Sequence, residues 1–168
     1  MALAIVIGWS LANAIQRIGD WSLSDMDAYW NAATRLREGL PLYPAVPDSG
    51  AADVFRYAPW FAWAWVPLTF LPKAAVAVAW SALLVGASAV AIMPIVRQPS
   101  LTRIAAAALL GTILLWSAAS GNVQPVIVAI LVLGIEGRSG PLWVAIAASL
   151  KIFPIGFALV YAGRREWR

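Results

Sequence analysis

The side chains that could do chemistry are few in this 168-residue chain, because it contains neither Cys nor His. Their absence excludes thiol nucleophiles, imidazole bases, disulfide frameworks and the usual zinc sites. Any reaction must therefore use carboxylates, amines, guanidinium groups, hydroxyls or amides. Six of the eight acidic residues lie in one polar stretch between Arg17 and Arg56: Asp20, Asp25, Asp27, Glu38, Asp48 and Asp53. A reactive carboxylate would come from this stretch.

A short amphipathic helix is expected over residues 25–38, within this stretch. Ser24, followed three residues later by Asp27, fits a capping box in which the Ser24 side chain caps the helix N-terminus. Gly39 and Pro41 then predict its end. Between these ends, apolar residues recur at helical spacing and form one stripe: Met26, Tyr29, Trp30, Ala33 and Leu36. The pattern predicts a helix that lies on a membrane surface.

Asp25 and Asp27 both fall in the first turn of this helix. Carboxylates at that position complement the helix dipole, a structural role worth about 0.3–1 kcal/mol each. The capping box uses Asp27, which favours a structural role for that residue. The box does not need Asp25, so both a structural and a chemical role remain open for it.

The elements that position these residues must lie in lipid. Apolar residues make up 62% of the chain and charged residues only 12%, so a folded protein of this size could not hide its apolar surface from water. Ten Trp and eleven Pro are typical of bilayer interfaces and of interrupted membrane helices. The net charge of +4 comes from basic residues scattered at loop ends, where they act as topology signals. Membrane lipids are therefore expected partners, and nucleic acid is not.

Charged residues divide the chain into hydrophobic blocks, which can be compared with the roughly 20 residues needed to cross a bilayer. Together the blocks predict one all-α, polytopic membrane domain over residues 1–168. Residues 1–16 lack a basic leading region and are expected to form a retained first transmembrane helix. The short loop between Arg97 and Arg103 is expected in the cytoplasm, which places the loop of residues 17–73 outside. Further membrane helices are expected at residues 74–96, 104–119, 122–135 and 141–163.

Residues 57–72 and 141–163 allow two interpretations each. Proline interrupts the first segment, which is expected to lie in the outer interface, anchored by its tryptophans Trp60, Trp63 and Trp65. One full crossing is the alternative. The second segment is long enough for a single span, but the basic residues after it favour two half-length helices that re-enter from the cytoplasmic side, with a turn near Lys151 and Pro154. The segment Ser117–Pro125 predicts a hairpin turn between the two helices that flank it.

Four segments of the chain resemble, in order, the hallmark segments of glycosyltransferase family 87, whose members are membrane enzymes of the GT-C fold. These segments cover most of the chain and read SDMDAYWNAATRLREGLPLYP, VFRYAPWFAWAWVPLTFLP, SGNVQPVIVAILVLG and ASLKIFPIGFALVYAGRREWR. The resemblance implies an inverting transfer of a sugar, typically mannose, from a polyprenyl-phosphate donor to a lipid or glycan acceptor. It places the reaction at the extracytoplasmic face of the plasma membrane and requires no nucleotide, metal or other cofactor.

The resemblance also assigns roles to residues. The family's aspartate in the first outer loop, four residues before a Tyr, falls on Asp25, with Tyr29 as that Tyr and Asp27 as the fallback. This aspartate would act as general base on the acceptor hydroxyl, a role worth about 100- to 10,000-fold in rate. The substrate-binding residues that the resemblance implies are Tyr29, Arg56, Tyr57, Asn122 and Lys151.

Three of these assignments rest on short motifs. The family's Tyr-x-Pro falls on Tyr57, its Gly-Asn tip on Asn122 and its Lys-x-x-Pro on Lys151. A Lys in an apolar block should face protein, water or an anion. The resemblance makes this anion the carrier phosphate, bound by Lys151 together with Arg56. Snorkelling or pairing with a loop carboxylate is the alternative for Lys151, and a helix cap is the alternative for Asn122.

Members of the family are usually more than twice as long as this chain, with further membrane helices after the Lys-x-x-Pro segment. The resemblance therefore implies the N-terminal transmembrane half of a GT-C-like fold. Three origins stay open for it: a truncated gene, a fragment, or one half of a split enzyme in which a second polypeptide supplies the remaining helices. Two other functions stay open: a non-catalytic membrane subunit or remnant, and a small lipid transporter or flippase. Transport predicts several polar residues along a path through the membrane, where the sequence offers Lys151 alone.

Overall fold

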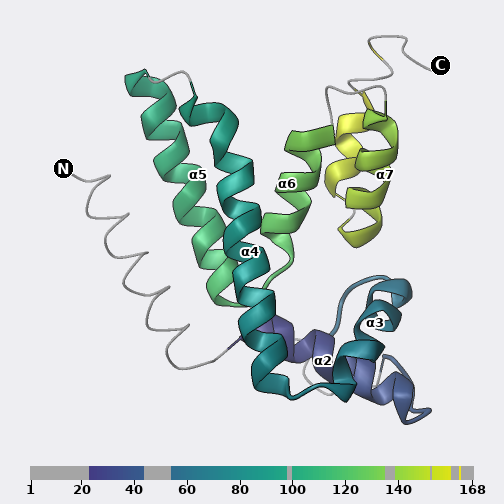
Figure 1. Ribbon diagram of the computed structural model, residues 1–168. Coiled ribbons are helices and arrows are strands. Elements are labelled where there is room, and N and C mark those ends of the chain that lie inside the picture. Colours follow the sequence, from purple (N-terminus) through teal and green to yellow (C-terminus); the bar gives the residue numbers. More distant parts are fainter. Residues whose placement is uncertain are drawn as a thin grey trace.

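The computed structural model describes residues 23–43, 54–97, 100–134, 139–151, 153–159 and 163, and within them every regular element is a helix. This confirms the all-α class. The expected first helix at residues 1–16 and the basic cluster Arg164–Arg168 lie outside the described residues. The elements, labelled in Figure 1, are α2 (Ser24–Arg37), α3 (Pro59–Trp65), the 3-10 helix η1 (Val66–Phe70), α4 (Lys73–Val96), α5 (Leu101–Ala119), α6 (Gln124–Gly134), α7 (Gly140–Leu150) and the 3-10 helix η2 (Phe153–Phe157).

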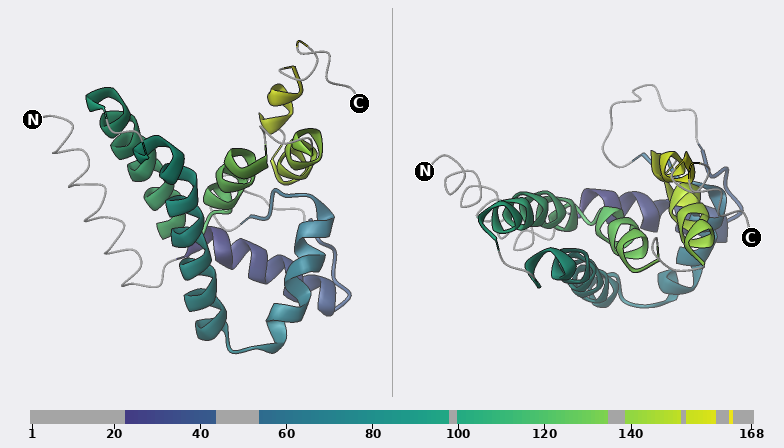
Figure 2. Two further views of the ribbon diagram at one scale, coloured as in Figure 1. Left: turned by 45° about the horizontal axis from the view of Figure 1, so that its top comes forward. Right: turned by 90° about the horizontal axis from the view of Figure 1, so that it is seen from above.

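Helices α4 and α5 are the two long helices, and they lie side by side in Figure 2. Their 24 and 19 residues give lengths of roughly 36 and 28 Å, close to the roughly 30 Å of a bilayer core. Only 28% of the apolar stretch of each helix is buried inside the protein. Large apolar side chains point outward along both, among them Leu83, Val85, Leu109 and Ile113. Such a surface needs lipid around it, so the chain is a helical membrane protein.

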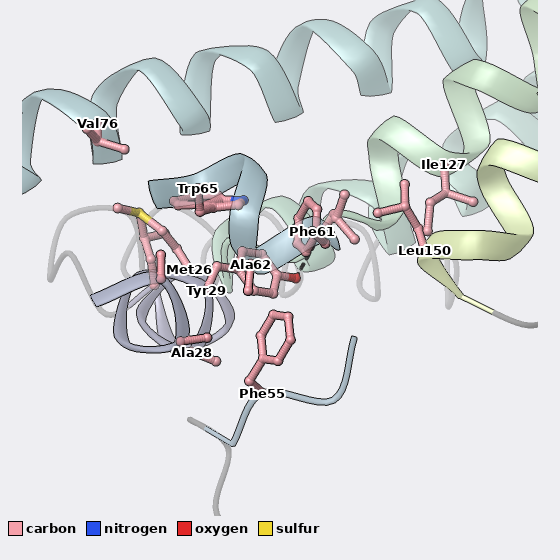
Figure 3. Close-up of a cluster of buried hydrophobic side chains, with 14 of the residues drawn as sticks. Met26, Ala28, Tyr29, Phe55, Phe61, Ala62, Trp65, Val76, Ile127 and Leu150 are labelled. Carbon is pink, nitrogen blue, oxygen red and sulfur yellow. Dashed lines mark hydrogen bonds between the residues drawn. The ribbon is translucent and has the colours of Figure 1, made fainter. Parts of the chain in front are cut away.

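A second layer, made of α2, α3 and η1, covers one end of these helices (Figure 1). Its core is Tyr29, which is fully buried and lies among Phe55, Phe61 and Trp65 in Figure 3. The ring of Tyr29 is 4.9 Å from that of Phe61 and 5.3 Å from that of Trp65, centroid to centroid. Aromatic pairs at such separations add about 0.5–1.5 kcal/mol each beyond the area they bury.

The interfacial segment differs from expectation at one of its tryptophans. Trp60 and Trp63 are exposed, as membrane anchors would be. Trp65 is only 2% exposed and packs against Tyr29 and Trp80, so its predicted role as an anchor is wrong. The alternative of a full crossing by residues 57–72 is also wrong. The seven residues of α3 and five of η1 reach only about 20 Å together.

The two ends of α2 compare differently with the sequence prediction. The helix begins at Ser24 with Leu23 as its N-cap, and no side chain caps it, so the predicted capping box is wrong. The N–H of Asp25 instead donates to the carbonyl of Ser120, at 2.9 Å, in a distant turn. The end is as predicted. Gly39 adopts φ +72°, and Leu40 N–H donates to the Arg35 carbonyl, as in a Schellman motif.

The remaining helices are short. Helix α6 packs against α4 on one side and against α7 on the other (Figure 1). Each of α6 and α7 has 11 residues, about 16 Å, too short to cross a bilayer alone. Gly134 lets the two approach closely, because a Cβ there would overlap the Trp143 ring. Helix α7 ends at Leu150, and Lys151 is extended (φ −139°, ψ 133°) before η2 begins. The expected break in the helix at Lys151 is present, and the choice between a single span and a re-entrant path over residues 141–163 stays a prediction.

Candidate functional site

The site begins at the turn between α5 and α6, against which the N-terminus of α2 packs. Gly121 adopts φ +76°, a conformation that favours glycine. A Cβ at Gly121 would stand 2.8 Å from the Met26 Cβ, so only glycine allows α2 to come this close. The carbonyl of Gly121 accepts a hydrogen bond from the Trp80 indole at 2.8 Å. The turn is thus held between α2 and α4.

Two phenols connect this turn to the segment before α3. The backbone N–H of Val123 donates to the Tyr29 hydroxyl at 3.2 Å, and Tyr29 donates in turn to the Tyr57 hydroxyl at 2.9 Å. Burial raises the pKa of both phenols, so both stay protonated at neutral pH. Because the Tyr57 oxygen accepts from Tyr29, the Tyr57 proton is left for another acceptor. The chain of donors therefore ends at Tyr57.

Lys151 reaches the same place from the end of α7. Its ammonium, which is half-buried, donates to Asn122 Oδ1 at 2.9 Å and to Gln124 Oε1 at 3.2 Å. It also lies 5.6 Å from the centre of the Tyr57 ring, within cation–π range. Asn122 Oδ1 accepts a second bond, from the Gln124 N–H at 3.0 Å, and so caps α6 as well. The structure gives Lys151 neutral oxygen partners where a loop carboxylate was the alternative.

The two acidic residues of α2 have different surroundings. Asp25 lies within electrostatic range of Tyr29, Tyr57 and Lys151. Asp27 forms an ion pair with Lys73 at 2.7 Å, at the start of α4, in a partly exposed position. The structure thus brings Asp25 to the cluster of predicted site residues and joins Asp27 to a neighbouring helix. Arg56 lies on the surface, next to Tyr57 in the chain.

Sequence reasoning missed two contributors to this site. Gln124 holds Lys151, and its signal was its place in the polar segment Ser117–Pro125, next to Asn122. Trp80 supports the turn from α4, and nothing in the surrounding apolar sequence distinguishes it from the other tryptophans. Within the described ranges, no group of three or more acidic residues is placed to hold a metal ion.

Taken together, the geometry offers a carboxylate, a fixed phenol donor and a charged amine around one turn. A carboxylate can take a proton from a hydroxyl, and an amine can stabilise an anionic leaving group. The sequence model of glycosyltransferase family 87 matches residues 55–168, which include Tyr57, Asn122, Gln124 and Lys151, while α2 precedes the match. No curated protein and no solved structure matches the chain. The family match covers more than half of the sequence, and the chain therefore belongs to glycosyltransferase family 87.

Proposed function

We propose that this chain is the N-terminal transmembrane half of a GT-C-type glycosyltransferase. In this proposal it transfers a sugar, with mannose as the first choice, from a polyprenyl-phosphate donor to a hydroxyl of a lipid or glycan acceptor. The reaction takes place on the extracytoplasmic side of the plasma membrane and needs no metal or cofactor. The observation that carries the proposal is the convergence of Asp25, Tyr57, Asn122 and Lys151, which come from four separate segments.

Each group has a role in an inverting displacement. Asp25 removes the proton from the acceptor hydroxyl as its oxygen attacks the anomeric carbon. The bond between that carbon and the phosphate oxygen breaks on the opposite side, and the electron pair leaves with the carrier phosphate. Lys151 stabilises the charge that develops on the phosphate. The Tyr57 hydroxyl supplies a neutral donor to the sugar or the phosphate.

The proposed function is tested by sugar transfer in membranes that contain the chain and a radiolabelled polyprenyl-phosphate mannose. Asp25→Asn removes the base and keeps the size of the side chain, so transfer should fall about 100- to 10,000-fold. Asp27→Asn is the matched control, because it removes the neighbouring carboxylate of the same helix, and it should keep transfer within about threefold. Full transfer by Asp25→Asn would overturn the role of Asp25 as the base.

A second polypeptide is part of the proposal, as the source of further helices around the site. Exposed leucines on α6, on α7 and just after η2 support it, since such side chains must face lipid or another chain: Leu133, Leu142 and Leu159. The transfer assay should therefore be run with the chain alone and with the product of a neighbouring membrane-protein gene. Transfer only on co-expression would identify a split enzyme. No transfer with either would favour a non-catalytic subunit.

A further inference from the structure

The two amide side chains that hold Lys151 are neutral, and this determines what the amine can still do. An ammonium has three N–H donors. Asn122 and Gln124 accept two of them, at 2.9 and 3.2 Å. One N–H is left for a ligand oxygen. Because the acceptors are dipoles and carry no charge, they orient the ammonium without forming an ion pair with it, and the Asp25 carboxylate lies within electrostatic range.

Gln124 controls this arrangement through two of its groups. Its side-chain oxygen holds Lys151 directly. Its backbone N–H donates to Asn122 Oδ1 and so fixes the amide that holds Lys151 from the other side. Gln124 also begins α6, next to a turn that packs against α2, so its own position is set by the fold. Nothing in the family resemblance gave this residue a role.

We propose that Gln124, together with Asn122, is a positioning residue that presents the Lys151 ammonium to one phosphate oxygen of a lipid-linked phosphate. The proposal rests on the proposed function, in which Lys151 faces the carrier phosphate. A carboxylate at residue 124 would form an ion pair with Lys151 and cancel the charge that the phosphate needs. A neutral acceptor does not compete with the phosphate for the Lys151 ammonium, which explains why residue 124 carries an amide and not a carboxylate.

The test measures binding, so that it does not require catalysis. The full chain is placed in lipid nanodiscs and titrated with farnesyl phosphate and, separately, with farnesol, which lacks the phosphate. Gln124→Glu should weaken farnesyl phosphate binding by about 10- to 100-fold. Gln124→Met keeps the length of the side chain and removes the acceptor, and it should cost about 3- to 10-fold. The affinity for farnesol should stay unchanged in both variants. General structural damage would instead weaken the binding of farnesyl phosphate and of farnesol alike.

Asn31→Asp is the matched control, because it adds the same negative charge on an exposed position of α2. It should leave the ratio of the two affinities unchanged. An unchanged ratio in Gln124→Glu would overturn the positioning role. Equal affinity of the unmodified chain for farnesyl phosphate and farnesol would overturn the phosphate role of Lys151 in the proposed function, whereas the Asp25→Asn transfer assay tests the base of that function independently.

Discussion

The two ends of α2 differ in their surroundings, because one is packed against a distant turn and the other is largely exposed. The N-terminal end, which we call the inner junction, consists of Asp25, Met26 and Tyr29 packed against the turn at residues 120–124. The C-terminal end, which we call the outer rim, holds Arg35, Arg37 and Gly39 and is largely exposed. At the outer rim, Arg37 donates to the Thr69 carbonyl at 3.0 Å and Arg35 to the Pro41 carbonyl at 2.8 Å. Arg37 also donates to the Thr69 hydroxyl at 3.1 Å, so the rim contacts hold α2 to η1 and to the segment that follows α2.

Two lysines that lie near the N-terminal end of α2 also differ from each other in their partners. Lys73, half-exposed, is neutralised by the Asp27 carboxylate. Lys151, in the inner junction, is held by amide oxygens and an aromatic ring. Exposed ion pairs contribute little to stability, since water already solvates both charges. An ammonium whose direct partners are neutral can still form an ion pair with an anionic ligand. The comparison teaches that Lys73 is paired directly with a carboxylate, whereas the direct hydrogen-bond partners of Lys151 are neutral.

The largest effect should come from the two glycines with positive φ, one in each region. Gly39→Ala at the outer rim places its Cβ in open space and should cost about 1–2 kcal/mol, for the left-handed conformation alone. Gly121→Ala at the inner junction adds a clash with Met26, for a total of about 2–4 kcal/mol. Denaturant unfolding in detergent measures both. Equal losses would mean that α2 does not pack tightly on the turn.

A smaller effect should come from the buried phenol. Tyr29→Phe leaves the Val123 N–H without its acceptor, so stability should fall by about 1–3 kcal/mol at neutral pH. Tyr43→Phe, at an exposed hydroxyl that donates to the Tyr57 carbonyl, is the control and should cost less than about 1 kcal/mol. Thermal unfolding of the purified variants checks the difference. A larger loss in Tyr43→Phe would contradict the comparison.

The same phenols predict a pH dependence. Burial raises the pKa of Tyr29 and Tyr57 above the ordinary value of 10.0. A group whose folded pKa is raised stabilises the protein fully below its unfolded pKa, and this contribution is lost as the pH rises through the folded pKa. Stability should therefore decline from about pH 10 upward, and less steeply in Tyr29→Phe. Unfolding midpoints measured from pH 8 to about 11 test this, and identical slopes would contradict it.

The smallest effect should come from the ion pair between α2 and α4. Lys73→Met removes the partner of Asp27 and should change stability by no more than about 1 kcal/mol, with a loss that shrinks at high salt. Transfer should stay near the unmodified level, because this lysine lies outside the inner junction. A loss of transfer as large as that of Asp25→Asn would place Lys73 in the site and erase the distinction between the two lysines.

Several helix ends and turns could be predicted from the sequence, because residues close by in the chain specify them. Gly39 predicted the end of α2, and the polar segment Ser117–Pro125 predicted the turn between α5 and α6. The basic residues after residue 163 predicted a turn near Lys151 and Pro154, and α7 ends at Leu150. Helix ends and turns depend on contacts within a few residues, which a linear sequence displays directly. The family resemblance was also in the sequence, and the match over residues 55–168 confirms the family, although the first of the four segments precedes this match.

The contacts between residues far apart in the chain, in contrast, were decided by the tertiary structure alone. Ser24 looked like a cap, but the Ser120 carbonyl, far along the chain, receives the Asp25 N–H instead. Trp65 is of a residue type that often anchors a protein at the membrane interface, but its side chain is buried in the core. The sequence by itself determined the structural roles that depend on residues close by in the chain, such as helix ends and turns. Asp25 and Lys151 come together only when the α5–α6 turn folds between them, since no local pattern specifies a partner more than a hundred residues away.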